Sequence, residues 1–140
     1  MIQPGVVDAT ELEAANEAAE ADALLAAGTF GAALRESPEF AALLRADAAL
    51  QADPESNAAI NAFGRRQAEL QMQLTFGTLD DSQRAELEAL HAAMLACPEV
   101  AAYVAAQGAF GAVCAETAAM ISDQIGIDFA ANCRSGGCCG

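Results

Sequence analysis

Three of the five cysteines in this sequence gather at its carboxyl end, in the segment 133–140, CRSGGCCG. Cysteine thiolates are soft ligands that suit iron–sulfur clusters and zinc. The two glycines between them leave the backbone free to wrap around a metal ion. Cys133, Cys138 and Cys139 are therefore candidate metal ligands, in a tail that we expect to be flexible.

A four-thiolate site needs one more ligand than this tail provides. A helix over residues 99–125 would place Cys97 at its far end and Cys114 roughly 17 Å before its carboxyl end, on the apolar face. We interpret Cys97 as a loop thiol and Cys114 as a core side chain. A partner chain supplies the missing ligand more easily than either of them.

Three interpretations of the tail stay open. Its cysteines are a ligand set for an iron–sulfur cluster or zinc that is completed by a partner, or a redox-active thiol pair, or a flexible end without defined chemistry. A disulfide between the adjacent Cys138 and Cys139 would close a strained eight-membered ring, which makes it a minor alternative.

The other reactive side chains do not match a known catalytic arrangement. His91 is the one histidine, and a dyad with Cys97 lacks a third group to orient it. A di-iron bundle needs two Glu-x-x-His elements, and only Glu88 to His91 has that spacing. The sequence also lacks a phosphate-binding glycine loop and a serine-nucleophile elbow. We expect a protein that is not an enzyme and has no catalytic residue.

The formal net charge of −14 limits the class of partner. All six basic residues are arginine, and only Arg65 and Arg66 are adjacent. Binding to nucleic acid requires a basic surface that releases counterions from the phosphates. We therefore expect no direct contact with nucleic acid or with an anionic membrane, whereas a basic protein partner would be attracted.

The sequence gives no sign of export or of a membrane span. The first residues, MIQPGVVD, lack a basic region and an adequate apolar stretch. The longest uncharged stretch, residues 100–115, is rich in alanine, and it is too short and too weakly apolar to cross a bilayer. Five cysteines are a poor disulfide framework. These features predict a cytoplasmic protein.

Proline and glycine divide the chain into helical blocks. Asp8 begins the first block as an N-cap, with Glu11 placed for a capping box. The triplets SPE at 37–39, DPE at 53–55 and CPE at 97–99 each begin another block, because proline and an acid suit the first turn of a helix. Residues 76–80 are predicted to be a loop, and Gly126 ends the last block. A break near Gly28 is left open.

Five residues in the third block follow the three–four spacing of a coiled-coil seam: Ile60, Phe63, Gln67, Leu70 and Leu74. We predict that this seam is an oligomer interface, with Gln67 setting register or partner choice. The alternative is that the seam belongs to the internal core.

Together these blocks predict an all-α protein, an antiparallel helical bundle of about five helices with long first, third and fifth helices. Residues 1–130 are predicted to form a single helical domain, followed by the Cys/Gly-rich tail at 131–140. Alanine supplies much of the 54% hydrophobic content and buries little area, so we expect thin helix contacts and burial gained from a second subunit.

The order of these boundaries resembles the YlbF/YmcA family of bacterial cell-fate regulators. The matching segments are LRESPEF at 34–40, DPE at 53–55 with Phe63 and Gln67 behind it, PEVAAY at 98–103, and IGIDF at 125–129 with the cysteine tail. The resemblance covers the chain from about Ala9 to Gly140. It implies an all-α fold, homo- or hetero-oligomers, and a non-enzymatic role in a complex that supports the ribonuclease beginning mRNA processing. It also implies iron–sulfur clusters bound by cysteines.

We therefore expect a cytoplasmic regulator or adaptor that works through helix-mediated association. It would form a homo-oligomer, with a dimer as the favoured state, or a hetero-oligomer with a related helical protein. Its tail would carry a shared iron–sulfur cluster or, failing that, zinc or nothing. Two other functions stay open. The chain is a metal carrier or redox protein, or its helical body is a leader for a chemically modified tail.

Overall fold

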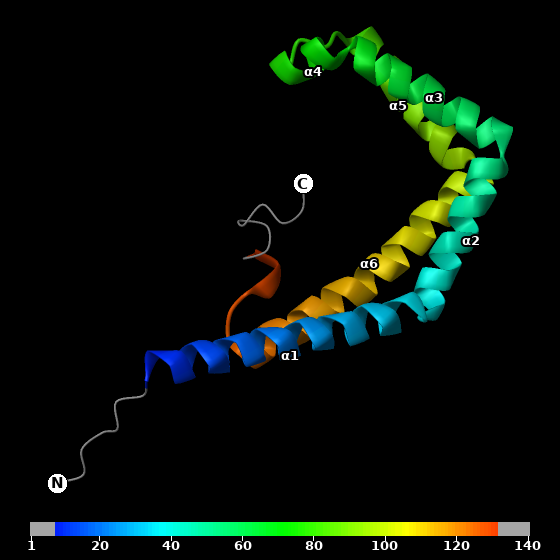
Figure 1. Cartoon of the computed structure of the whole chain (residues 1–140). Coiled ribbons are helices and arrows are strands. Elements are labelled where there is room, and N and C mark those ends of the chain that lie inside the picture. The colour runs from blue at the N-terminus through cyan, green and yellow to red at the C-terminus, as the bar shows by residue number, and fades with distance from the viewer. Residues whose placement is uncertain (1–7, 132–140) are drawn as a thin grey trace. The chain divides into compact units, whose positions relative to one another are not determined.

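A computed structural model describes residues 8–131, and six α-helices account for most of them (Figure 1). They are α1 (Ala9–Arg35), α2 (Pro38–Ala52), α3 (Pro54–Glu69), α4 (Gln71–Phe76), α5 (Asp81–Ala96) and α6 (Pro98–Ile125). The described residues contain no strand. The prediction of an all-α protein is confirmed; the described part holds these six helices and a helical segment at 129–131, in place of about five helices.

The chain divides into two compact units at the boundary between Ser37 and Pro38. The first contains α1, and the second contains α2 to α6. This division does not test the predicted single domain over 1–130. That boundary stays a prediction, as does the tail at 131–140, of which only Ala131 is described.

Helix α1 is continuous over 27 residues. The carboxylate of Asp8 accepts a hydrogen bond from the Thr10 N–H at 3.3 Å, as an N-cap does. Neither Gly28 nor Gly31 interrupts the helix, so the break left open near Gly28 is absent. No side chain of α1 is buried, which agrees with its alanine-rich sequence.

The second unit is built from two helix pairs. Helix α2 packs against α6, and α3 packs against α5 (Figure 1). Each pair is antiparallel: Phe40 lies against Phe110 in the first, and Phe63 lies against His91 in the second. The prediction that each helix folds back on the one before it is therefore not confirmed. At the proline junctions α2 continues into α3, and α5 continues into α6, so the helices that pair are α2 with α6 and α3 with α5.

Polar side chains hold the junction between α2 and α3. The Asp53 carboxylate caps α3 by accepting from the Ser56 N–H at 2.8 Å. Ser56, through its side chain first and its backbone N–H second, holds the pKa of the Asp53 carboxyl below its usual value. The Asn57 amide donates to the carbonyls of Leu50, Gln51 and Asp53 at 3.1, 3.1 and 2.8 Å. Carbonyls at the end of α2 thus find donors at the start of α3.

Little of the second unit is buried. Among residues 8–131 the buried apolar side chains are Leu70, Cys97 and Val100, and the one buried polar residue is Ser56. Three of these four lie at the two junctions, beside Asp53 and Pro98. The core is therefore concentrated where the two helix pairs meet.

Leu70 divides the predicted third helix in two. It is 3% exposed and has φ −98° and ψ 10°, outside the helical values, so α3 ends before it and α4 begins after it. The expectation of one long third helix through Leu74 is wrong. No proline or glycine marks the break; burial of the Leu70 side chain accompanies it, and local helix propensity does not encode that burial.

The remaining helix ends agree with their sequence signals. Asp80 and Gln83 form a reciprocal capping box at the start of α5, with hydrogen bonds of 2.7 and 3.1 Å. Gly126 ends α6 in the left-handed conformation, at φ 74°, as predicted. Gly77 ends α4 in the same way, at φ 65°.

Among the described residues, α6 is the one helix whose length and composition would let it cross a membrane. This is a weak sign, since the core helix of a soluble protein meets the same criterion. The apolar character of α6 comes largely from alanine, and one of its faces packs against α2. The structure therefore gives no positive evidence of a membrane protein.

Candidate functional site

The five residues of the predicted seam lie in three different environments. Ile60 and Phe63 are half-buried on α3, and Leu70 is buried at the break between helices. Gln67 is exposed, and Leu74 on α4 is 37% exposed. The seam thus contributes both to the interior of the second unit and to its surface. Whether its exposed part binds another chain stays a prediction.

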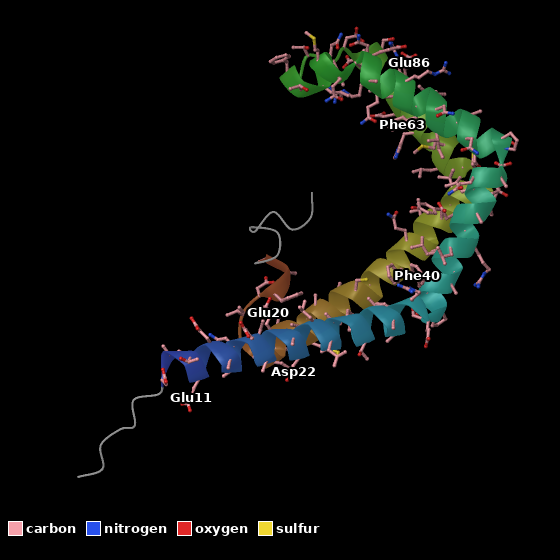
Figure 2. The ribbon with its side chains drawn as sticks, in the orientation of Figure 1. Glu11, Glu20, Asp22, Phe40, Phe63 and Glu86 are labelled. Carbon is pink, nitrogen blue, oxygen red and sulfur yellow. The ribbon has the colours of Figure 1, made fainter. Side chains whose placement is uncertain are left out.

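The exposed part of the seam lines a groove between α3 and α5. Its walls are Phe63 and Gln67 from α3, Leu74 from α4, and Leu87, Glu88 and His91 from α5, and its volume is about 280 Å³. We call these six residues the α3–α5 groove. Figure 2 labels Phe63 on α3, which gives the position of the groove. Its floor is apolar, and Gln67, Glu88 and His91 add polar groups.

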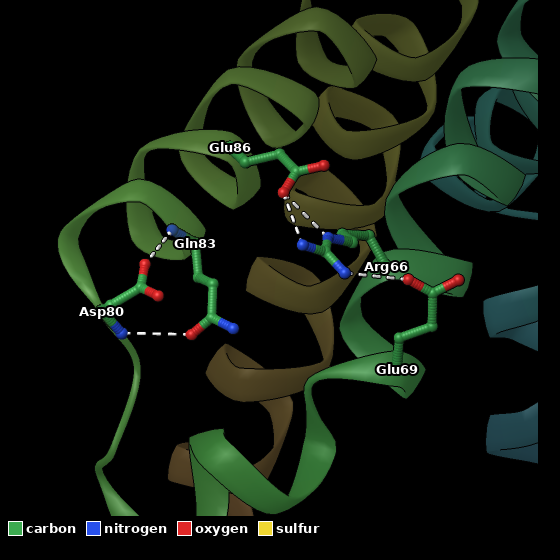
Figure 3. Close-up of polar contacts among 5 residues, drawn as sticks. All are labelled: Arg66, Glu69, Asp80, Gln83 and Glu86. Atoms are coloured by element: carbon green, nitrogen blue, oxygen red, sulfur yellow. Dashed lines mark hydrogen bonds and ion pairs between the residues drawn. The ribbon is translucent and has the colours of Figure 1, made fainter.

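A ring contact and an ion pair hold the two walls of the groove together. The rings of Phe63 and His91 are 5.3 Å apart between centroids, at an angle of 45°. The Arg66 guanidinium donates from Nε and Nη2 to one oxygen of Glu86, at 2.9 and 2.7 Å (Figure 3). The groove is therefore defined by side-chain contacts between the helices as well as by the backbone.

Arg66 also has a partner on its own helix. Its Nη1 donates to the Glu69 carboxylate at 3.0 Å (Figure 3). Hydrogen bonds to Glu86, and then to Glu69, raise the pKa of Arg66 above its usual value. The guanidinium keeps its charge in any case, so its role here is to fix α3 against α5.

The groove offers both apolar and polar contacts to a bound group. Its one titratable pair, Glu88 and His91, has no neighbouring nucleophile among the six lining residues. Within residues 8–131, no three histidine, cysteine, aspartate or glutamate side chains gather closely enough to hold a metal ion. His91 lies beside the seam, is exposed, and contacts the ring of Phe63.

The predicted metal ligands Cys133, Cys138 and Cys139 lie outside the described residues. Of the two described cysteines, Cys97 is buried, and its thiol donates to the Ala93 carbonyl at 3.6 Å; Cys114 is half-buried on α6. Seventeen residues of helix separate them, or about 26 Å at 1.5 Å per residue. At most one of them could join a site formed by the tail.

Sequence reasoning missed a pair of exposed apolar side chains beside the groove. Met72 is 72% exposed and Phe76 is 73% exposed, and their spacing of four places them on one face of α4. We call these two residues the α4 face. They also line a hollow of about 410 Å³ with Ala68 and Thr78. The signal was present in the sequence, because residues 70–79 carry no charge, but those residues were divided between a seam and a loop.

Comparison with known proteins gives one match. The family model described as control of competence regulator ComK, YlbF/YmcA, matches residues 23–126, which contain the second unit except for residues 127–140. Neither the comparison with curated proteins nor the comparison with solved structures finds a significant similarity. Since the family model spans most of the chain, including every residue of the groove, this protein belongs to the YlbF/YmcA family.

Proposed function

We propose that this protein is a non-catalytic regulatory adaptor that acts by joining other helical chains, as a homo-oligomer or with a related protein. The family to which it belongs consists of regulators and is described by control of the competence regulator ComK. A role in supporting mRNA processing, which the resemblance implies, fits the same proposal. The acidic surface argues for protein partners in the cytoplasm and against direct nucleic-acid binding.

The observation that carries this proposal is the shortage of buried apolar area. Three apolar side chains are buried among residues 8–131, while several large ones of the second unit are at least 49% exposed: Leu44, Met72, Phe76, Val104 and Met120. Exposed apolar side chains in this number are typical of proteins that bury them against a partner. The α3–α5 groove offers a defined place for such a contact.

The mass of the protein in solution tests this proposal. Sedimentation or light scattering in reducing buffer, at micromolar concentration, should give a species of at least twice the 14.2 kDa chain mass. The reductant excludes disulfide dimers formed through the tail. A 14.2 kDa species throughout, together with a pull-down that recovers no helical partner, would contradict the proposal.

For the tail, we propose that Cys133, Cys138 and Cys139 are part of a ligand set for an iron–sulfur cluster shared with a partner. The presence of three cysteines within eight residues favours this proposal. Of the two described cysteines, Cys114 is half-buried and Cys97 is buried, so Cys114 is the more accessible candidate for a further ligand. Anaerobic purification should give visible absorption and iron, and both should be lost in Cys138→Ser but kept in Cys97→Ser. If the protein has no colour and contains no iron or zinc, both when purified alone and when purified with its partner, the proposal is wrong.

A metal-carrier or redox function is the alternative for the same tail. It predicts a reversible redox signal and transfer of the metal to an acceptor. A helical leader with a modified tail would instead show an intact mass from the native host that differs from the sequence mass within 133–140.

A further inference from the structure

Resting on the proposed adaptor function, we propose that α1 binds a basic amphipathic helix of a different protein. That helix has large apolar side chains on one face and lysine or arginine along both edges of the face. The two helices pair as strands of a coiled coil. The proposal thus names the chemistry of one partner and the helix that receives it.

One face of α1 has the spacing of a coiled-coil strand. Six residues at intervals of four and three occupy the positions that face a partner helix in such a strand. They are Leu12, Asn16, Ala19, Ala23, Ala26 and Phe30, and we call them the α1 stripe. Leu12 is 57% exposed and Phe30 is 40% exposed, and no side chain of α1 is buried. Most helices in proteins are stabilised by a packed apolar face, so the α1 stripe is a surface suited to another helix.

The small side chains of the α1 stripe indicate what kind of face it accepts. Three of its six residues are alanine, which lets the backbone of another helix approach closely. Well-packed helices set large side chains against small ones. A second copy of α1 would oppose mostly alanine with alanine and bury little area. A partner helix with leucine or similar side chains on its apolar face fits the stripe better.

Acidic residues lie along both edges of the α1 stripe. The edge positions of a coiled coil set partner choice, because their side chains form ion pairs between the helices. Glu13 and Glu20 lie on one edge and Asp22 lies on the other; Figure 2 labels Glu20 and Asp22. Within residues 8–131, none of these three carboxylates is in an ion pair. Lysine or arginine at the edge positions of a partner helix would complement all three.

The chain itself supplies too few basic residues for this contact. Residues 8–34 contain six acidic residues and no basic one, and the second unit, residues 38–140, contains thirteen acidic and five basic residues. A second copy brings the same charges. The charge of α1 therefore favours a different, basic protein over either part of its own chain. The family match begins at residue 23, so the three acidic edge residues lie outside it.

Synthetic helices of about 24 residues test the proposal with the full-length chain. The probe has leucine at the positions that face α1 and lysine at the edge positions. One control peptide has glutamate in place of the lysines, and another has the composition of the probe in scrambled order. By calorimetry in reducing buffer with about 0.15 M salt, the probe should bind at least about tenfold more tightly than the scrambled peptide, because scrambling keeps the charge but removes the apolar face. The glutamate peptide should not bind.

Matched variants of the full-length chain place the contact on one face of α1. Leu12→Glu should weaken binding of the probe at least about tenfold, since it removes an apolar contact and puts a carboxylate in its place. Leu25→Glu makes the same change on the opposite face, at a residue that is 72% exposed, and should alter binding by less than about twofold.

A second pair of variants tests the edge charges. Glu20→Lys should weaken binding of the probe about three- to fivefold, because an ion pair becomes a repulsion. Glu17→Lys makes the same change of charge away from the α1 stripe and should have an effect of less than about twofold. Circular dichroism confirms that the variants keep their helices.

The last test locates the bound helix. Phe30 is replaced by the photoreactive amino acid p-benzoylphenylalanine, and with excess probe its cross-links should fall on the probe. Cross-links to the second unit or to a second copy overturn the inference, as does equal binding of the probe and the scrambled peptide or an equal effect of the two leucine variants. In each of these cases an oligomer of the unchanged protein leaves the proposed association standing. A monomer that binds neither the probe nor any helical partner overturns both.

Discussion

The contact between α2 and α6 consists of alanine-rich surfaces and one ring pair, Phe40 and Phe110, with centroids 5.4 Å apart. The contact between α3 and α5 has a ring pair too, but it adds the ion pair of Arg66 with Glu86 and a groove with polar edges. Within residues 8–131, that ion pair is the one that joins two helices. Small side chains let α2 and α6 pack closely, whereas larger ones in α3 and α5 leave a shaped surface.

This difference suggests that the two helix pairs of the second unit have different roles. The contact between α2 and α6 has few features that would distinguish one partner from another. The α3–α5 pair carries the specific features: a fixed charge, a groove and, at its end, the α4 face. Specific recognition depends on such features more than on buried area alone.

The largest effect expected from a single change is that of Leu70→Ala. Leu70 is 3% exposed at the end of the α3–α5 pair, so its truncation should lower the free energy of unfolding by about 3 kcal/mol. Leu44→Ala in the α2–α6 pair, at a residue 54% exposed, should cost less than about 1 kcal/mol. Urea denaturation at one fixed protein concentration measures both. Equal losses would mean that the two helix pairs do not differ in this way.

A double-mutant cycle on Phe40 and Phe110 comes next. Each change to alanine should cost about 2 kcal/mol, because both rings are half-buried, and the coupling energy should be about 1 kcal/mol. The same cycle on Phe63 and His91 provides the comparison across the groove. A coupling energy near zero for the first pair would show that the contact between the two rings adds nothing beyond the burial of each ring.

Asp53, at the junction between the helix pairs, predicts a dependence on pH. Its folded-state pKa lies below its unfolded value, so the ionised carboxylate stabilises the fold fully above about pH 4. That contribution is lost as the pH falls through the lowered folded-state pKa. Asp53→Asn keeps an N-cap but cannot titrate, and its urea midpoint should therefore fall less between about pH 5 and pH 2 than that of the unchanged protein.

The smallest effect is expected from Arg66→Ala. Arg66 joins two helices through Glu86, but these side chains are partly exposed, so the melting temperature should fall slightly at low salt. The difference should nearly vanish in about 1 M salt, where charges are screened within a few ångströms. Arg65→Ala, on an exposed neighbour, is the matched control. A loss that persists in high salt would indicate packing by the arginine stem in place of the charge.

Sequence reasoning located most helix boundaries, because those boundaries are local. The proline junctions at Pro38, Pro54 and Pro98 and the left-handed Gly126 each depend on one residue's backbone preference. The pairing of α2 with α6 could not be predicted in this way. The two helices are far apart in the sequence, and neither has a distinct apolar face. Alanine on many faces gives the pattern too little contrast to identify a partner.

The candidate site was predicted in part for a similar reason. Phe63, Gln67 and Leu74 were identified by their heptad spacing, and all three line the groove. That spacing assumed one straight helix, whereas Leu74 lies on α4, beyond the break at Leu70, and Met72 and Phe76 are exposed on the same short helix. The second wall, with Leu87 and His91, comes from α5 and becomes apparent only once α3 and α5 are known to be neighbours.

The Asn57 side chain has a consequence for how the protein opens. Its amide joins carbonyls at the last turn of α2 to the first turn of α3, so neither helix end can fray without breaking the other's hydrogen bonds. Local unfolding normally starts at helix ends, where protection from hydrogen exchange is lowest. At this junction we expect the two ends to open together, so that amides on either side of Asp53 exchange their hydrogens as one cooperative group.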